Sequence, residues 1–250
     1  MSVVRLRPAD LRDALAASAT SLQFQVQVHL PTTALAGVEA LVRWPHPVLG
    51  MVGPQEITQL VDQGGLHVEF DRWVLDAACS QMALWQREGV PLPLIGVNIW
   101  EPTLRMPDFL QLASAATERA GIAPEMLEIE LPRGAALEPA LVAVIGSVRT
   151  RGIRIAADVR ALEDMPPIEI DTVKLPYPLI SAIAEPGSRA MAESIIAAAR
   201  ARNMRVVAEG VETTEQQQAV LAAGCETVQG YVFGPEASAA EVSTLARRSS

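Results

Sequence analysis

Several residue types are scarce in this sequence, and their scarcity limits the kinds of site that it can form. The 250 residues include two cysteines, three histidines and one lysine. Cys79 and Cys225 lie far apart, without the close spacing of a metal motif, and the histidines are scattered. The sequence therefore argues against a zinc site and against a disulfide framework.

Long apolar runs are also absent. Hydrophobic residues make up 50% of the chain, yet no uninterrupted stretch of about 18 apolar residues occurs, so they belong to a core and not to a bilayer. The start, MSVVRLRPADLRDAL, has no apolar run resembling a signal segment. We therefore expect a cytoplasmic protein without membrane insertion.

Positive charge is scarcer than negative charge. The chain has 20 basic and 29 acidic residues, which gives a formal net charge of −9. DNA, RNA and anionic membranes are bound through clustered Lys and Arg, so none of them is expected as the main partner. A phosphate-bearing ligand would need a cation in its site.

Short β-rich runs alternate with longer segments of helical period along the whole chain, as in βα units. Over about 250 residues this alternation predicts an α/β protein with a closed (β/α)8 TIM-like barrel. The first two strands are separated only by PTTALA, which is too short for a parallel crossover, so the first strand should be antiparallel. The predicted strands are 22–30, 36–44, 93–99, 126–131, 153–159, 171–175, 204–211 and 226–232.

Helices are expected in most of the gaps between these strands. We predict one domain, in which residues 1–20 form an N-terminal helical segment and residues 21–250 form the barrel. The predicted helices of the barrel are 54–63, 68–88, 108–120, 137–151, 187–203 and 213–224.

Nearly every predicted strand carries one polar residue in or just after its apolar run. In such a barrel the strand ends and the loops that follow them build one face, so these side chains could converge although they are far apart in sequence. The seven residues are Glu39, Asn98, Glu130, Asp158, Lys174, Glu209 and Gln229.

The chain's single lysine, Lys174, lies in one of these apolar strands. An unpaired ammonium would be costly there, so we expect a buried acidic partner or a role in a site. The carboxylates and the amide oxygen around it are hard ligands, which suit Mg²⁺ or Mn²⁺. A divalent metal in an acidic pocket is a common means of holding and cleaving a phosphodiester.

Five segments in this order resemble the EAL domain, the bacterial phosphodiesterase and receptor domain for cyclic di-GMP. They are GVEALVRWPHPVLGMVGP, GVNI, LEIEL, VVAEGVET followed by EQ, and GC-TVQGYVF. The resemblance runs from about Leu22 to Pro235. It implies a barrel with an antiparallel first strand and a cyclic di-GMP site.

The resemblance also implies roles for single residues. By this match Lys174 would contact the attacking water, and Glu209 would serve a second metal and act as the base. The metal ligands would be Glu39, Asn98, Glu130 and Asp158. The nucleotide would meet Gln25, Leu41, Arg43, Glu212 and Gln229.

Departures from the family pattern cluster around Asp158. Where the family has DDFGTGYSSL, this chain reads DVRALEDM, so Val159 replaces the second aspartate and the loop is shorter and without glycine. In the EITES pattern, Arg133 stands in the place of the second glutamate. Trp100 and Pro176 replace a serine and an aspartate of two other motifs, and QGYVFGPE lacks the final arginine of its motif.

Three functions remain open from the sequence. The one that we favour is a receptor that recognises cyclic di-GMP and hydrolyses it slowly or not at all. The second is a working phosphodiesterase that yields pGpG, with Glu163 or Asp164 as substitute ligand. The third is a nucleotide-independent interaction protein. A homodimer or a protein effector stays open as partner, and the chain could be a fragment of a longer protein.

Overall fold

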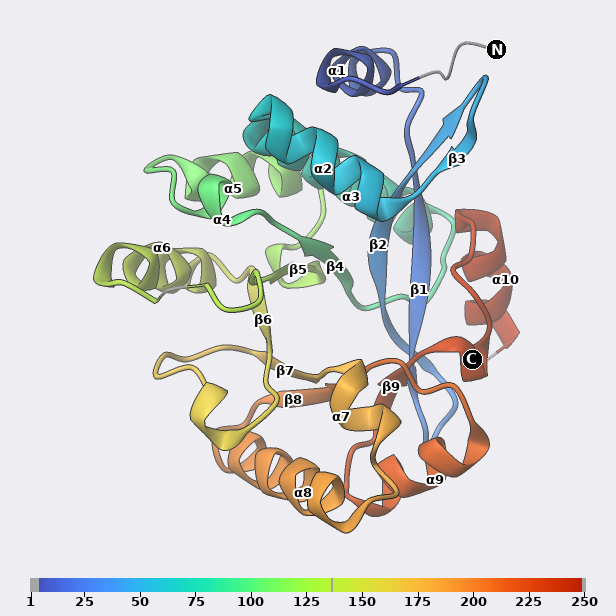
Figure 1. Cartoon of the computed structure of the whole chain (residues 1–250), viewed down its shortest axis with the longest axis vertical. Coiled ribbons are helices and arrows are strands. Elements are labelled where there is room, and N and C mark those ends of the chain that lie inside the picture. Colours follow the sequence, from blue (N-terminus) through green and yellow to red (C-terminus); the bar gives the residue numbers. More distant parts are fainter. Residues whose placement is uncertain (1–4, 136, 249–250) are drawn as a thin grey trace.

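Eight strands close into a barrel surrounded by helices (Figure 1). The computed structural model describes residues 5–135 and 137–248. The order around the barrel is β1, β2, β4, β5, β6, β7, β8, β9 and back to β1. The strands are β1 Ser21–His29, β2 Leu35–His46, β4 Ile95–Asn98, β5 Leu127–Glu130, β6 Arg154–Asp158, β7 Thr172–Leu175, β8 Arg205–Ala208 and β9 Thr227–Gln229.

The first strand has the orientation that the short connection predicts. Strand β1 pairs antiparallel with both β2 and β9, whereas the remaining pairs around the barrel are parallel. The eight predicted strands and the TIM-like barrel are confirmed. The parallel strands therefore direct their carboxyl ends to one face of the barrel, which is where such folds place their sites.

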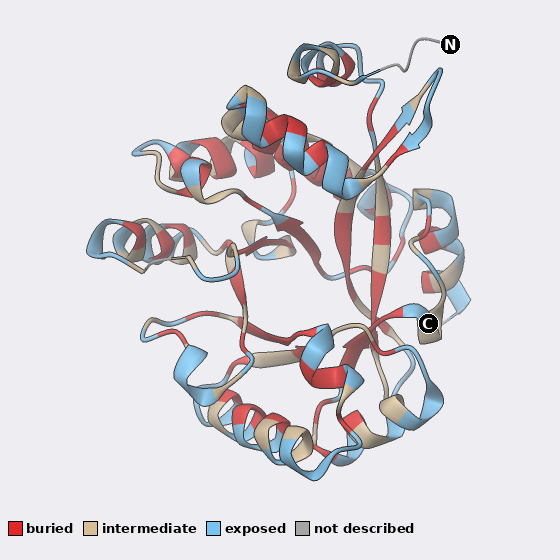
Figure 2. Cartoon of the chain, in the orientation of Figure 1, coloured by how far each residue is buried: buried red, intermediate tan, exposed pale blue. Residues whose placement is uncertain are grey.

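Helices cover the outside of the barrel, with their buried faces turned inward (Figure 2). All six predicted helices are confirmed, with ends shifted by a few residues. The helices of the described chain are α1 Pro8–Ala16, α2 Pro54–Gly64, α3 His67–Arg87, α4 Glu101–Leu104, α5 Phe109–Ala120, α6 Pro139–Thr150, α7 Tyr177–Ser181, α8 Pro186–Ala201, α9 Thr214–Ala222 and α10 Ala239–Arg248.

The N-terminal helix α1 lies inside the segment 1–20 that we predict to be helical, of which residues 1–4 fall outside the described residues. Its apolar side chains Leu11 and Leu15 are buried in the common core. The division of the chain at residue 20 remains a prediction.

Four helices and strands of the described chain were not predicted from the sequence: the short helices α4 and α7, strand β3 and helix α10. Strand β3 (Gly50–Val52) forms a hairpin with the end of β2, because Pro45 and His46 continue the strand instead of turning. A proline is tolerated at such an outer position, where no ladder donor is lost. Helix α10 was missed although Ser238 and Glu241 form a capping pair, a recognised start signal.

None of the helices in the described part of the chain is long and apolar enough to cross a membrane.

Asp71 on α3 is a buried acid that ties this helix to the loop after β4. It is fully buried, and its Oδ2 accepts the backbone N–H of Trp100 at 3.0 Å. Burial raises the pKa of Asp71 to about 7, because the hydrogen bond from the Trp100 N–H and the nearby Thr103 hydroxyl only partly offset the lost hydration.

We predict that stability falls as pH rises from about 4 to about 7, because the unfolded chain loses this proton first. Asp71→Asn keeps an oxygen for Trp100 and should remove this fall. At pH 8 the variant should be more stable than the wild type by up to about 4 kcal/mol. Urea unfolding at pH 5 and pH 8 measures how the free energy of unfolding changes with pH in the wild type and in Asp71→Asn. An equal change in the two proteins would contradict the prediction.

Candidate functional site

The polar residues of the strand ends gather at the carboxyl face of the barrel. Asn98 and Glu130 are paired across β4 and β5, and Asp158 and Lys174 across β6 and β7. Glu209 directly follows β8, where its backbone N–H donates to the carbonyl of Leu175. The barrel therefore brings together side chains that come from all parts of the sequence.

Lys174 is the centre of this group. Its side chain is 2% exposed, and its Nζ donates to Glu39 Oε2 at 3.1 Å and lies 2.7 Å from Glu209 Oε1. It also donates to Glu130. Burial alone would lower the pKa of Lys174, but the attraction of the three carboxylates outweighs burial and raises it, so the ammonium stays charged. The buried acidic partners expected from the sequence are present.

The three carboxylates around Lys174 are not equivalent. Burial would raise the pKa of Glu39, but Lys174 and the amides of Gln229 (2.7 Å) and Asn98 (2.8 Å) outweigh burial and lower it. Burial raises the pKa of Glu130 well above its usual value, with the Glu39 charge adding to this effect. Burial also raises the pKa of Glu209. Glu39 is thus the carboxylate that the site holds most firmly ionised.

A single hard cation fits this cluster. One oxygen each of Glu39, Glu130 and Glu209 lie within 4.8 Å of one another. Oε1 of Glu130 is buried, and no described residue gives it a hydrogen bond. The glutamate is accommodated because Gly96 has no Cβ, which would lie 2.7 Å from this oxygen. A buried acceptor without a donor, beside two further carboxylates, suits Mg²⁺ or Mn²⁺.

A second cation does not fit in the same way. Asp158 lies outside the carboxylate cluster, and its Oδ2 accepts from Arg133 Nε at 2.9 Å and Nη2 at 2.6 Å. Val159 is fully buried in the core and offers no ligand atom. Glu163 and Asp164 are exposed and also remain outside the cluster.

The cluster opens into a cleft with an apolar and a polar half. The apolar half is a cavity of 320 Å³ bordered by Leu41, Arg43 and Trp100, and the polar half is a cavity of 660 Å³ bordered by Arg133, Asp158 and Lys174. Both halves share the side chains of Thr58, Asn98, Glu130 and Pro132. The cleft therefore offers an apolar surface directly beside the charged groups.

The residues that resemblance assigns to the nucleotide do not all meet. Two of them, Gln229 and Gln25, are in contact, because Gln229 Nε2 donates to Gln25 Oε1 at 3.4 Å. Arg43 borders the apolar cavity and donates to Glu236 at 2.8 Å. Glu212 is exposed on the loop before α9 and borders neither half of the cleft. The assigned roles remain predictions.

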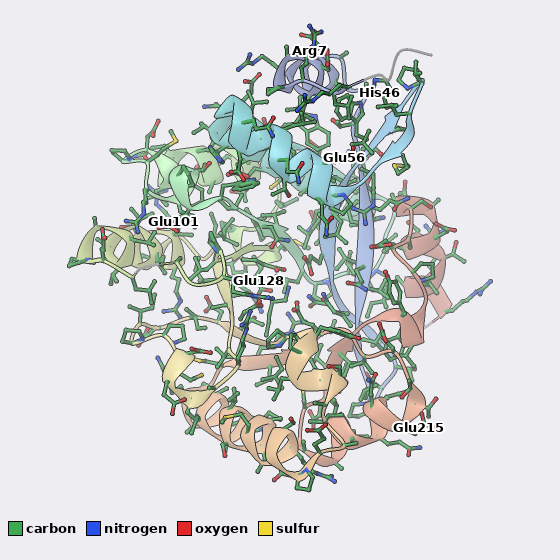
Figure 3. The ribbon with its side chains drawn as sticks, in the orientation of Figure 1. Arg7, His46, Glu56, Glu101, Glu128 and Glu215 are labelled. Carbon is green, nitrogen blue, oxygen red and sulfur yellow. The ribbon has the colours of Figure 1, made fainter. Side chains whose placement is uncertain are left out.

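A polar network inside the barrel was missed by the sequence analysis. Arg205 donates to Gln27, Gln27 donates to Gln229 at 3.1 Å, and Gln229 donates to Glu39. Glu128, which is labelled in Figure 3, lies on β5. It is fully buried and accepts from the Thr172 hydroxyl. The sequence did contain a signal for this network. Side chains alternate along β1, which places both Gln25 and Gln27 on the inner face of the barrel.

Thr58 was also missed. It borders both halves of the cleft but comes from helix α2, so a search of strand ends does not find it.

The sequence model of the EAL domain matches residues 9–236. The match covers most of the chain, and it agrees with the barrel and with the acidic residues around its one buried lysine. The chain belongs to the EAL domain family.

Two relatives illustrate the similarity. The bifunctional diguanylate cyclase/cyclic di-GMP phosphodiesterase MucR of Pseudomonas aeruginosa is 31% identical over an alignment of 236 residues that covers 90% of this chain and 34% of MucR. The oxygen sensor protein DosP of Escherichia coli is 28% identical over 94% of this chain and 30% of DosP. The chain spans about a third of the length of these relatives.

Solved structures agree with the barrel. A structure described as the MucR phosphodiesterase in complex with c-di-GMP has a TM-score of 0.85 and 30% identity, covering 94% of this chain and 98% of the other. The EAL domain of FimX from Xanthomonas citri has a TM-score of 0.83 at 20% identity, covering 91% and 92%, and supports the fold alone.

We predict that Lys174→Met destabilises the protein by about 3–5 kcal/mol in EDTA, because the buried Glu39 and Glu130 and the half-buried Glu209 lose their cation. Mg²⁺ or Mn²⁺ should restore part of this loss by binding between them. Denaturant unfolding with and without metal measures both effects.

Arg119→Met is the matched control, since Arg119 and Asp76 form an exposed ion pair that should contribute less than about 1 kcal/mol. An equal loss for Lys174→Met in EDTA and in Mn²⁺ would exclude the cluster as a cation site.

Proposed function

We propose that this chain is a receptor domain for cyclic di-GMP whose phosphodiesterase activity is weak or absent. One observation carries the proposal. The charged cluster around Lys174 is complete and adjoins an apolar cavity. Near Asp158 and Val159, where the resemblance implies a second cation, Asp158 is paired with Arg133 and the buried Val159 offers no ligand atom. Nucleotide binding needs the charged cluster and the apolar cavity, whereas hydrolysis also needs a second cation.

The apolar half of the cleft suits a guanine base. Leu41 and Trp100 would contact its face, and the planar guanidinium of Arg43 suits a guanine edge or a phosphate. Gln25, Glu212 and Gln229 remain proposed contacts of the same ligand. The complex of the similar MucR domain with c-di-GMP supports this choice of nucleotide.

Mg²⁺ or Mn²⁺ would be held by Glu39 and Glu130, with Asn98 as an exposed amide beside them. Such an ion neutralises phosphate charge and lowers the pKa of bound water. Lys174 would hold a water molecule next to the phosphodiester, and Glu209 would accept a proton from this water. The charge of Glu39, bonded to Lys174, keeps this lysine in place.

Hydrolysis should be slow because a component that acts mainly in the transition state is missing. Loss of such a charge-stabilising group typically costs about 10²–10³ in rate. The nucleotide affinity depends less on that group, so we infer that recognition survives better than cleavage.

Two other functions are less well supported. A working phosphodiesterase that yields pGpG would need Glu163 or Asp164 as substitute ligand, but both are exposed, and Asp164 accepts the backbone N–H of Arg160 at 3.2 Å. A nucleotide-independent scaffold would have no need for three buried carboxylates around a lysine, since burying such charges is costly.

Calorimetry with cyclic di-GMP in EDTA and in Mg²⁺, followed by chromatography of the product, separates the three functions. We expect binding with little or no pGpG. Several turnovers per second in Mg²⁺ or Mn²⁺ would establish a phosphodiesterase, and no binding in either buffer would leave the scaffold.

We predict that Glu39→Gln weakens cyclic di-GMP binding in Mg²⁺ by about tenfold or more, because a cation ligand and a partner of Lys174 are lost together. Glu128→Gln is the matched control, since Glu128 is also a buried barrel glutamate but lies outside the carboxylate cluster. Equal dissociation constants for Glu39→Gln and the control in Mg²⁺ would contradict the proposed metal site.

The cytoplasmic location and the homodimer or protein effector expected from the sequence remain predictions.

A further inference from the structure

Arg133 has an unusual place beside the cluster. It follows β5 and lies in a turn, where its side chain is 53% exposed and pairs with Asp158. Both of its bonds, from Nε and Nη2, go to a single oxygen of Asp158. None of the residues that the structure describes accepts from Nη1, so one edge of the guanidinium is free.

Arg133 borders the polar half of the cleft and also the neighbouring cavity. Two cations border the polar half among the described residues, Arg133 and Lys174. Lys174 is buried, and three glutamates occupy its ammonium. Arg133 is therefore the cation of this cavity that can still bind an anion without giving up its protein partner.

An anionic ligand needs such a group here. Glu130 and Asp158 border the same cavity, and Glu39 and Glu209 lie beside Glu130 in the carboxylate cluster, so together they would repel a phosphodiester. The planar fork of an arginine suits phosphate oxygens, and Asp158 fixes the orientation of this fork before a ligand arrives.

We propose that Arg133 is a phosphate-binding residue, whose guanidinium takes the position at Asp158 that a second divalent cation would hold. It binds a non-bridging oxygen of a phosphodiester in the polar half of the cleft. This assignment rests on the proposed function, because the phosphodiester is that of cyclic di-GMP.

Replacing a cation by an arginine separates binding from cleavage. A guanidinium supplies positive charge and N–H donors, but it binds no water molecule as a ligand and remains protonated. The site thereby keeps its attraction for the phosphate and gains no nucleophile. Arg133 thus accounts for a domain that recognises the nucleotide without opening its ester.

The test is calorimetry of cyclic di-GMP in EDTA with Arg133→Ala and Arg133→Lys. Arg133→Ala should raise the dissociation constant by about 10- to 100-fold, as expected for a lost bond to a charged group. Arg133→Lys keeps the charge without the fork and should lie between the wild type and Arg133→Ala. In Arg133→Ala, Mn²⁺ should restore part of the affinity through the released Asp158, and a further Asp158→Asn change should abolish that restoration.

The matched control is Arg160→Ala, which removes one exposed positive charge near Asp158 from the neighbouring cavity. The dissociation constant of Arg160→Ala for cyclic di-GMP should equal that of the wild type. If the wild type binds and Arg133→Ala binds equally well in EDTA, the role of Arg133 is refuted while the receptor function stands. If the wild type binds in neither EDTA nor Mn²⁺, the receptor function fails, and the assignment of Arg133 fails with it.

Discussion

The carboxyl face of the barrel depends on the contact of one ammonium with three carboxylates. Glu39 lies on β2, Glu130 on β5 and Glu209 directly after β8, and each would repel the others if Lys174 were absent. Because the cluster is almost closed to water, this repulsion would be poorly screened. Lys174 therefore holds the middle of β2 and the ends of β5 and β8 in the spacing that a site requires.

The same contact extends into the barrel through neutral amides. Gln229 donates to Glu39, and Gln27 and Arg205 continue the chain of hydrogen bonds toward the opposite end. Amides satisfy buried acceptors without adding charge, so they orient Glu39 at low electrostatic cost. The barrel interior is thus a polar support for the site and not only an apolar filling.

The sequence predicted the barrel well because each strand has its own apolar run and its own polar end. The convergence of Glu39, Glu130, Lys174 and Glu209 followed from that pattern and the shared direction of the strands. The partner of Arg133 could not be predicted, because the direction of a turn side chain depends on the whole loop. The β3 hairpin was missed because Pro45 and Pro47, on either side of His46, disfavour a strand, whereas the pairing of β2 with β3 depends on contacts that the local sequence does not show.

The central claim is that this face holds one divalent cation and an arginine where two cations could otherwise lie. Anomalous diffraction from crystals grown with Mn²⁺ and cyclic di-GMP tests it most directly. The account predicts one manganese peak, beside Glu39 and Glu130, with the Arg133 guanidinium on a phosphate oxygen. Two manganese peaks, the second bound by Asp158 with Arg133 displaced, would contradict it.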